Sequence, residues 1–362
     1  MKPLKIIFIL PSFAGGGAEK VAISLYNNLY KLGHNTRLII QNNSGPLSDE
    51  IINKNFIDLK SDKFRYSIIK LIRNINRFKP DIIFSTFPHI TLPLIFMRDY
   101  FYKNTKIVAR EPNMRDISFE HSSYPKILKF LSNKYSNKCN KIIVTSKAMK
   151  MDFINTGVDE ILLNLIYNPI DVSGIRKIKV LNRHAGKGLR FIIVGRLVYQ
   201  KGIDRVLPLL KSLSNCHLTI IGEGPDKDKL KKQSLELNIN NKVKFMNFTQ
   251  NAKSYIAGSD YLLLPSRWEG LPNVVLESLA LGTPVISLKE IISLKDLIPF
   301  VKENSLKLCK NIDEINSLMK KLQYREDFIK PKIRRNLLLE YNSPIVYAKK
   351  IEKIFKEVLI AE

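Results

Sequence analysis

Two long stretches of this chain alternate short apolar runs with helical patterns, and this alternation limits the fold more than any other feature. In the first stretch, apolar side chains recur at helical spacing between Phe64 and Phe78. The β-type runs around this helix are Lys5–Leu10, Leu38–Ile40, Phe56–Leu59, Asp81–Ser85, Ile107–Ala109 and Ile142–Thr145. Strands that alternate with helices form βαβ units with a parallel sheet, so the sequence predicts an α/β domain.

The alternation restarts after Ser173–Leu189, a basic segment with few large apolar residues that is typical of a linker. Strands are then predicted at Phe191–Val194, His217–Ile221, Val243–Phe245, Tyr261–Leu264 and Val285–Ile286, and helices at Asp204–Leu213, Lys227–Leu237 and Lys253–Ser259. We therefore expect two α/β domains in tandem, at residues 1–170 and 171–343. Ligands of such sheets bind at the carboxyl ends of the strands, and the default site is a cleft between the domains.

The length and composition of the chain are typical of a globular protein. The chain has 362 residues, and its hydrophobic content of 45% is ordinary. The apolar run Ile6–Leu10 is too short for a secretion signal, and no stretch reaches the roughly 18 apolar residues of a membrane helix. The 3 cysteines are far apart, which argues against a disulfide framework or a zinc site. We expect a cytoplasmic protein.

The formal net charge of +26 is the one unusual bulk property, and the excess is spread over both halves of the chain. Such a field attracts membrane surfaces, phosphorylated substrates or nucleic acid. General lysine-rich usage explains the charge equally well. Within the first domain, the helix predicted around Phe64–Phe78 carries Lys63, Arg65, Lys70, Arg73, Arg77 and Lys79. Together with Lys126, Lys129, Lys134 and Lys138, this helix suits either a membrane-surface contact or an ordinary solvated basic face.

The segment Pro265–Ile286, PSRWEGLPNVVLESLALGTPVI, carries the most specific chemistry. Its turn at Glu269–Pro272 leads into a helix predicted over Asn273–Leu281, so Glu269 lies in front of the helix and Glu277 lies one turn inside it. At the start of this helix, the N–H groups of Asn273, Val274 and Val275 are expected to be unpaired donors that attract anions. Carboxylates beside an anion site suit a ligand with both hydroxyls and phosphates, such as a nucleotide sugar.

Glycines and cations follow the first strand of each domain. Gly15–Gly17 opens a helix, where the backbone approaches a phosphate closely, but it lacks the G-x-G-x-x-G pattern of nicotinamide-binding folds. In Gly195–Gly202, GRLVYQKG, Arg196 ends a strand and Lys201 follows near the next helix. Both cations suit a diphosphate, and both also suit the solvated surface of a basic protein.

Three other loops follow predicted strands. Gly222–Pro225 lets a base or ribose lie against the backbone, and Asp226-Lys227-Asp228 has a metal-type spacing but stands where acids favour a helix start. His89 is a candidate proton carrier or hydroxyl ligand, or a structural loop histidine. The loop Arg110–Arg115 lines an acceptor site or is plain surface charge.

These segments resemble glycosyltransferase family 4, the retaining GT-B enzymes. GGGAE at 15–19, GRLVYQKG at 195–202, IIGEGP at 220–225 and SRWEGLPNVVLESLALGTPVI at 266–286 fall in the order and spacing of that family. The resemblance implies two facing Rossmann-like domains with a cleft between them. It also implies that a final helix within 344–362 crosses back onto the first, acceptor-binding domain, while 171–343 binds the nucleotide sugar.

The resemblance also implies roles for individual residues. Glu269 would bind hydroxyls of the donor sugar, Glu277 the ribose, and His89 the donor sugar. Arg196 and Lys201 would neutralise the diphosphate, assisted by Gly16 and the amides near Asn273. The implied catalytic residues are thus Glu269, His89, Arg196 and Lys201, and the implied donor-binding residues are Gly16, Arg196, Lys201, Glu269, Gly270, Leu271, Asn273, Val274 and Glu277. No metal or other cofactor is expected, because these cations and helix dipoles would stabilise the leaving diphosphate.

The predicted function is retaining transfer of a hexose or N-acetylhexosamine from a UDP-sugar to a lipid-linked or surface-polysaccharide glycan. A polyprenyl-diphosphate acceptor would bring the protein to the inner face of the cytoplasmic membrane as a peripheral protein. One departure from the family concerns 287–295, SLKEIISLK, where a glycine pair usually helps hold the donor sugar. Two alternatives stay open, a GT-B sugar epimerase and a polyanion-binding protein, although no nucleic-acid-binding motif is present and no nucleic-acid partner is expected.

Overall fold

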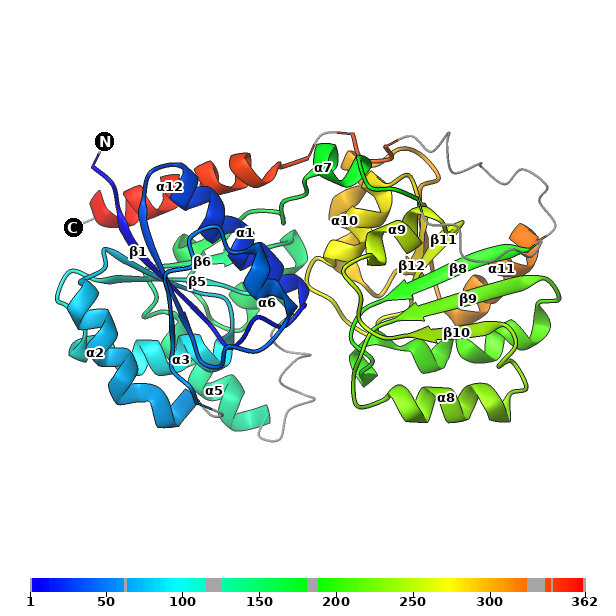
Figure 1. Cartoon of the computed structure of the whole chain (residues 1–362), viewed down its shortest axis with the longest axis horizontal. Coiled ribbons are helices and arrows are strands. Elements are labelled where there is room, and N and C mark those ends of the chain that lie inside the picture. Colours follow the sequence, from blue (N-terminus) through cyan, green and yellow to red (C-terminus); the bar gives the residue numbers. More distant parts are fainter. Residues whose placement is uncertain are drawn as a thin grey trace. The chain divides into compact units, whose positions relative to one another are not determined.

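The structure is a computed structural model that describes residues 2–61, 64–114, 125–180, 188–323, 336–339 and 341–360. Its contacts divide the chain into two compact units (Figure 1). Unit 1 comprises Met1–Pro169 and Asn342–Glu362, and unit 2 comprises Ile170–Tyr341. The C-terminal helix α12 (Pro344–Ile360) therefore belongs to unit 1, although the whole of unit 2 precedes it in the sequence. Each unit is described by itself.

Unit 1 is built on a parallel sheet with strand order β3-β2-β1-β4-β5-β6-β7. The strands are β1 (Lys5–Leu10), β2 (Asn35–Ile40), β3 (Phe56–Asp58), β4 (Ile82–Ser85), β5 (Lys106–Arg110), β6 (Lys141–Val144) and β7 (Leu163–Leu165). Their apolar residues are buried on both faces, as expected for a parallel sheet between helices. The strand order reverses between β1 and β4, which makes the loops after these two strands the favoured ligand-binding position.

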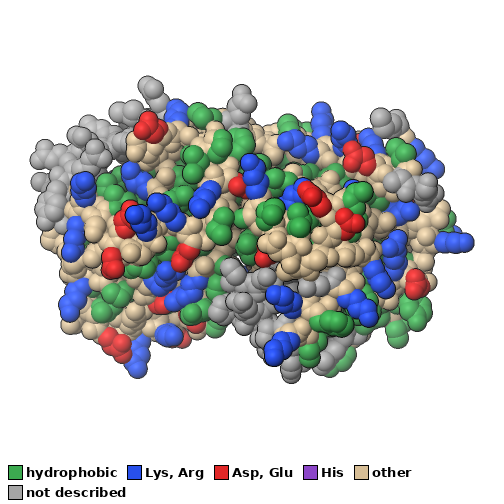
Figure 2. All heavy atoms as spheres, turned by 180° about the vertical axis from the view of Figure 1, so that it is seen from behind, with side chains coloured by type: hydrophobic (Ala, Val, Ile, Leu, Met, Phe, Trp, Pro, Cys, Tyr) green, Lys and Arg blue, Asp and Glu red, His purple; other side chains and the backbone are tan. Residues whose placement is uncertain are grey.

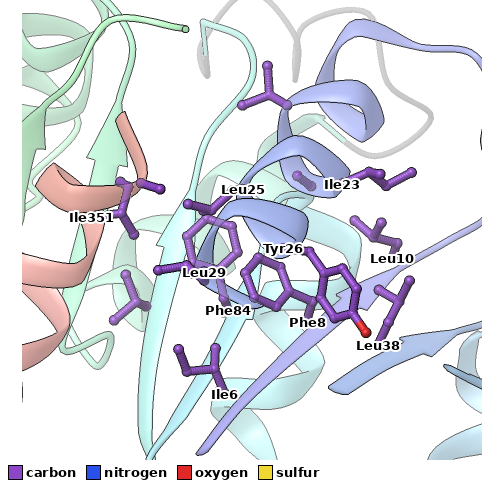
Figure 3. Close-up of a cluster of buried hydrophobic side chains, with 14 of the residues drawn as sticks. Ile6, Phe8, Leu10, Ile23, Leu25, Tyr26, Leu29, Leu38, Phe84 and Ile351 are labelled. Carbon is purple, nitrogen blue, oxygen red and sulfur yellow. The ribbon is translucent and has the colours of Figure 1, made fainter. Parts of the chain in front are cut away.

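Two helical layers cover this sheet. On one face, α1 (Gly17–Lys31) and α12 pack on the sheet, and Figure 3 shows Leu25 and Tyr26 of α1 beside Phe8 and Phe84 of the strands. The rings of Phe8 and Tyr26 meet edge to face at 5.6 Å, a favourable aromatic geometry. The other face is covered by α2 (Ile68–Phe78), α3 (Pro88–Phe96), α5 (Pro125–Ser136) and α6 (Lys147–Asn155), together with the short helices η2 (Phe64–Ser67) and η3 (Arg98–Tyr100).

Unit 2 repeats the architecture with a parallel sheet of order β10-β9-β8-β11-β12-β13. The strands are β8 (Leu189–Val194), β9 (Cys216–Ile221), β10 (Val243–Met246), β11 (Tyr261–Leu264), β12 (Val285–Leu288) and β13 (Leu306–Cys309). The order reverses between β8 and β11. The helices are α7 (Val172–Arg176), α8 (Lys227–Glu236), α9 (Ala252–Ala257), α10 (Asn273–Ala280) and α11 (Ile312–Gln323). The prediction of two parallel α/β units is confirmed.

Two segments of unit 2 differ from the sequence prediction. The predicted helix at Asp204–Leu213 is a series of short 3-10 turns, η6 (Ile203–Arg205) and η7 (Leu207–Ser212). Pro208 has no N–H group to donate and its ring crowds the preceding turn, which disfavours a continuous α-helix at this point. The predicted linker Ser173–Leu189 begins inside α7, where Asp171 caps the helix by accepting from the N–H of Gly174 at 2.9 Å.

The remaining short elements are η1 (Pro46–Glu50), η4 (Glu160–Leu162), η5 (Tyr199–Lys201) and η8 (Ile292–Phe300). Cys139, Cys216 and Cys309 are all buried free thiols, and burial raises the pKa of Cys216 to about 11. None of the helices in the described ranges combines the length and the apolarity that a bilayer span requires. Lys and Arg side chains are scattered over the face seen in Figure 2 and do not gather in a single stripe there.

Candidate functional site

The candidate site of unit 2 is formed by the loops that follow β8 and β11, the two neighbouring strands at which the strand order reverses. The first loop carries Arg196 and Lys201, and the second carries Ser266 and Glu269. Parallel strands deliver both loops to the same edge of the sheet, where ligands of such folds bind.

An ion pair joins these two loops. The ammonium group of Lys201 donates to Oε1 of Glu269 at 2.5 Å, and the hydroxyl of Ser266 donates to the same oxygen at 2.7 Å. Glu269 is 7% exposed, so water does little to screen this pair. Within the described chain, no residue bonds the second oxygen of Glu269. The carboxylate is thus fixed through one oxygen and presents the other.

Backbone contacts hold the two loops in register. Gly202 adopts a left-handed conformation (φ 60°), and a Cβ at this position would lie 2.2 Å from the carbonyl oxygen of Pro265. The N–H of Arg267 donates to the carbonyl oxygen of Gln200 at 2.8 Å, and the Gln200 amide donates to the carbonyl oxygen of Trp268 at 2.9 Å. Only glycine permits this approach at position 202, which explains the final residue of the GRLVYQKG motif.

Arg267 adds a side-chain clamp. Its guanidinium makes two bonds to the carboxylate of Asp204, at 2.9 and 2.7 Å, and a third to the carbonyl oxygen of Tyr199 at 2.7 Å. It also lies over the Tyr199 ring, 3.8 Å from the centroid. The hydrogen bond from Arg267 holds the pKa of Asp204 below its ordinary value. Three hydrogen bonds thus engage this cation within unit 2.

Arg196 differs from Arg267 in its exposure and in its partners. Its side chain is exposed, and no partner for it exists among the described residues. Its carbonyl oxygen accepts from the N–H of Val198 at 3.1 Å, which folds the loop back after the strand. The guanidinium of Arg196 is therefore without a partner among the described residues, in the same loop after β8 as Lys201.

The glycines of the Gly222–Pro225 loop are needed for packing. A Cβ on Gly222 would lie 1.9 Å from the carbonyl oxygen of Gly195, and one on Gly224 would lie 2.2 Å from that of Leu197. The N–H of Leu197 donates to the carbonyl oxygen of Glu223 at 2.8 Å. The loop after β9 is thus pressed backbone to backbone on the loop that carries Arg196. The idea that these glycines make room for a base or ribose stays a prediction.

A Gly224→Ala substitution should lower the free energy of unfolding by about 2 kcal/mol, because the new methyl group forces two backbone segments apart. Urea denaturation measures this change. Gly195→Ala is the matched control, since its Cβ would meet nothing closer than 3.4 Å, the Cε of Lys201. Equal stability of the two variants would show that the two loops are not packed in this way.

The start of α10 differs in one detail from the expectation. The N–H of Val275 is not an unpaired donor, because it donates to the carbonyl oxygen of Pro272 at 3.1 Å in a tight first turn. Asn273 and Val274 open the helix without a side-chain cap. One turn in, Oε1 of Glu277 lies 3.6 Å from the ammonium group of Lys253 on α9. In the turn before the helix, Gly270 and Leu271 are buried.

In unit 1, Gly16 is the N-cap of α1, the helix after β1. The carboxylate of Glu19 folds back onto it, so that a Cβ on Gly16 would lie 2.3 Å from Oε2 of Glu19. A carboxylate at this place is attracted by the positive end of the helix dipole. The helix start near Gly16 thus has an anion of its own.

His89 lies in the first turn of α3, after β4, the other strand at the reversal of unit 1. Its ring contacts that of Phe87, with centroids 5.5 Å apart. The residue is exposed to solvent, and desolvation by the surrounding protein lowers the pKa of its imidazole, which favours the neutral form. Gly16 and His89 therefore follow neighbouring strands of the unit 1 sheet.

Surface charge is one of two interpretations of Arg110–Arg115, and it is wrong for Arg110, the last residue of β5, and for Glu111. Arg110 is 1% exposed and Glu111 is 5% exposed. Nη2 of Arg110 donates to Oδ1 of Asn168 at 2.6 Å, so Arg110 ties β5 to the end of unit 1. Arg115 lies outside the described residues.

Sequence reasoning missed Ser266, Arg267 and Asp204 as parts of the site. Ser266 and Arg267 stand inside the motif that drew attention to Glu269, so their position was the available signal. Asp204 is 63 residues from Arg267 in sequence, and no spacing rule pairs them. The same holds for Lys201 and Glu269, which are 68 residues apart.

Two family models together match most of the chain. Residues 15–173 match the model described as Glycosyltransferase Family 4. Residues 175–335 match the model described as Glycosyl transferases group 1. The matched ranges contain all four residues predicted to be catalytic.

Curated relatives carry related names. An uncharacterized glycosyltransferase of Methanocaldococcus jannaschii is 29% identical over 62% of this chain and 59% of its own length. The N-acetylgalactosamine-N,N'-diacetylbacillosaminyl-diphospho-undecaprenol 4-alpha-N-acetylgalactosaminyltransferase of Campylobacter jejuni is 27% identical over 78% of this chain and 80% of its own length. Among solved structures, Anabaena HepE in complex with UDP-glucose superposes with a TM-score of 0.75 at 16% identity, covering 98% of both chains. At this identity the likeness concerns the fold alone.

Proposed function

Because this chain belongs to the family 4, group 1 glycosyltransferases, we propose that it transfers a hexose or N-acetylhexosamine from a UDP-sugar to a lipid-linked glycan, with retention of configuration. The observation that carries this proposal is the fixed Lys201–Glu269 ion pair beside the free guanidinium of Arg196. One relative is named for an undecaprenol-diphosphate-linked acceptor, and one similar fold holds UDP-glucose. Both names support the proposed donor and acceptor classes.

The proposed step exchanges one bond at the anomeric carbon. The bond from that carbon to the diphosphate oxygen breaks, and a bond to the acceptor hydroxyl oxygen forms on the same face of the sugar. The acceptor proton passes to the leaving diphosphate, and UDP departs. No side chain of the enzyme becomes covalently linked in this step, so the work of the protein is positioning and electrostatic stabilisation.

The charged groups divide this work. Arg196, with its planar fork of donors, would bind the diphosphate, and Lys201 would add a second positive charge as the leaving group develops. The free oxygen of Glu269 would accept from a hydroxyl of the donor sugar, and Glu277 would accept from the ribose. We also propose that these cations suffice without a bound metal ion.

Unit 1 would bind the acceptor in this proposal. The loops after β1 and β4, which carry Gly16 and His89, stand at the preferred ligand position of its sheet. A neutral imidazole suits a hydrogen bond to a sugar hydroxyl better than a charged one, since its free ring nitrogen accepts. Because the acceptor is lipid-linked, the enzyme would work at the inner face of the cytoplasmic membrane as a peripheral protein.

A thermal-shift screen across UDP-, GDP- and ADP-sugars in EDTA tests the donor class. A ligand at about 100 times its Kd stabilises the folded state by roughly 2.7 kcal/mol. For a unit of this size that free energy raises Tm by roughly 5–10 °C. We expect this rise in Tm with a UDP-sugar and not with the GDP- or ADP-sugars, and we expect it in EDTA. A rise that appears only after a divalent metal is added would contradict the metal-free proposal.

Product analysis completes the test. Incubation with the stabilising UDP-sugar and a polyprenyl-diphosphate glycan should give UDP and an extended glycan with the anomeric configuration of the donor. Release of an epimerised sugar without any acceptor would instead identify an epimerase. Stabilisation by GDP- or ADP-sugars only would overturn the choice of nucleotide.

A further inference from the structure

One layer of unit 1 exposes several large apolar side chains close together, which is unusual for a surface that faces only water. The layer comprises η2, α2 with its C-cap Lys79, the end of α3, η3 with the residues up to Tyr102, and α5 with the residues up to Lys138. Three contacts join these elements: Asn76 of α2 donates to the carbonyl oxygen of Tyr100 at 2.8 Å, Arg98 donates to that of Lys138 at 2.9 Å, and the rings of Phe96 and Tyr135 are 3.9 Å apart. We call the outward side of this layer the α2–α5 face.

The apolar side chains of the α2–α5 face are large and strongly exposed. They are Tyr66 (71%), Ile69 (76%), Phe96 (48%), Tyr100 (69%), Tyr102 (44%), Ile127 (58%) and Phe130 (62%). Five of the eight exposed Tyr and Phe side chains in the described chain belong to this one layer. Such a concentration marks an interaction surface, since soluble surfaces expose large apolar groups singly.

Six exposed cations of this face form no ion pair among the described residues. Neither α2 (IIKLIRNINRF) nor α5 (PKILKFLSNKYS) contains an acidic residue. The exposed cations of the face for which the described structure gives no ion pair are Arg73, Arg77, Lys79, Lys126, Lys134 and Lys138. Helices elsewhere in the chain do pair their lysines, as in Lys232–Glu236 on α8 and Lys353–Glu357 on α12. Lys63 and the side chain of Arg65 lie outside what the structure describes.

The exposed apolar side chains and the cations lie on the same side of each helix. On α2 and the turn before it, Tyr66, Ile69, Arg73 and Arg77 are three or four residues apart and so lie on one side. On α5, Ile127, Phe130 and Lys134 have the same spacing, and the ammonium group of Lys134 lies 5.8 Å from the centre of the Phe130 ring. Apolar tips surrounded by cations match the boundary between lipid headgroups and acyl chains.

We propose that the α2–α5 face binds the surface of a bilayer that contains anionic lipid, with its aromatic and isoleucine side chains among the headgroups. The inference deepens and rests on the proposed function, whose lipid-linked acceptor requires the enzyme to work at a membrane. A nucleic acid would pair with the cations but would gain nothing from Ile69 and Ile127. The combination of both side-chain classes therefore favours lipid.

Sedimentation with sucrose-loaded vesicles tests this proposal on the full-length protein. One vesicle type contains phosphatidylglycerol and phosphatidylcholine, and the other contains phosphatidylcholine alone. The charge variant is Arg73→Gln with Arg77→Gln, and the apolar variant is Ile69→Ser with Phe130→Ser. The matched control, Lys231→Gln with Leu235→Ser, changes exposed residues of the same kinds on α8 in unit 2; Leu235 is 60% exposed.

The expected result is binding of the wild-type protein to the anionic vesicles only, weakened by salt. Each cation near an anionic membrane contributes about fivefold to the partition coefficient, so the charge variant should partition at least about tenfold less. The apolar variant should lose at least as much, while the control should bind as the wild type does. Wild-type binding by both face variants would overturn the proposal.

A second arm separates lipid from other polyanions. If a single-stranded oligonucleotide binds the wild type and the apolar variant equally well and displaces both from vesicles, the face is a general polyanion site and the proposal fails. The UDP-sugar thermal shift is measured on the same variants. If a face variant loses vesicle binding but keeps its UDP-sugar thermal shift, the result agrees with both proposals. If the wild type binds vesicles but shows no UDP-sugar thermal shift, the membrane inference stands and the proposed function is wrong.

Discussion

Glu269→Gln should lower kcat for sugar transfer by about 10²–10³, the usual effect of removing one charged group that acts on the transition state. The substitution keeps the size of the side chain and an oxygen that accepts from Ser266. It removes the negative charge that Lys201 now contacts at 2.5 Å. It also replaces one carboxylate oxygen by an NH2 group, which cannot accept from a hydroxyl of the donor sugar as we propose for Glu269. Steady-state kinetics with saturating donor and acceptor measure the effect.

Ser266→Ala is the matched control for this prediction. It deletes a hydrogen bond from a neutral hydroxyl to the same carboxylate oxygen, a loss of stability of about 1.5–3 kcal/mol, and leaves the ion pair in place. We expect kcat to fall less than tenfold in this variant. If Glu269→Gln retained kcat within tenfold of the wild type, the carboxylate would have no charged role in transfer, and the assignment of this site would be wrong.

Arg196→Ala should nearly abolish transfer without weakening the fold. Arg196 is exposed and has no described partner, so its removal leaves no buried group unsatisfied. Its loss would remove the bidentate contact proposed for the diphosphate, which we expect to lower kcat/KM by about 10²-fold or more. Kinetics and urea denaturation of one preparation give both quantities.

Arg267→Ala should have the opposite effect, a loss of stability without the loss of a contact to the donor. Arg267 makes two bonds to Asp204 and one to the Tyr199 carbonyl oxygen, so its removal should lower the free energy of unfolding by about 2 kcal/mol. Its guanidinium should not contact the donor. If Arg196→Ala lost stability as Arg267→Ala does, or if it kept wild-type activity, the division between a ligand-binding and a structural arginine would be wrong.

The sequence predicts most of the fold because periodicity reports on local structure. Apolar runs such as Lys5–Leu10 and Tyr261–Leu264 coincide with β1 and β11, whose residues are almost all buried. The prediction was wrong where local chemistry competed with the pattern. Pro208 turned a predicted helix into 3-10 turns, and Asp171 capped a short helix inside a predicted linker.

The sequence names the residues of the candidate site but not the contacts between them. The motifs located Arg196, Lys201 and Glu269 because each follows a strand at the carboxyl edge. The bond between Lys201 and Glu269 depends on two loops that come together only when β8 pairs with β11. The loop 287–295 illustrates the same limit, since its Glu290 forms an ion pair of 2.5 Å with Arg205 that no local pattern announces.

Isothermal titration of UDP and of the matching UDP-sugar into the wild type and Glu269→Gln tests the central claim most directly. We expect the wild type to bind the UDP-sugar. We expect Glu269→Gln to bind UDP within about twofold of the wild type but to lose at least about tenfold in affinity for the UDP-sugar, a change of about 1.4 kcal/mol. Equal affinities of both proteins for the UDP-sugar, or no binding of either ligand by the wild type, would contradict the proposed role of Glu269.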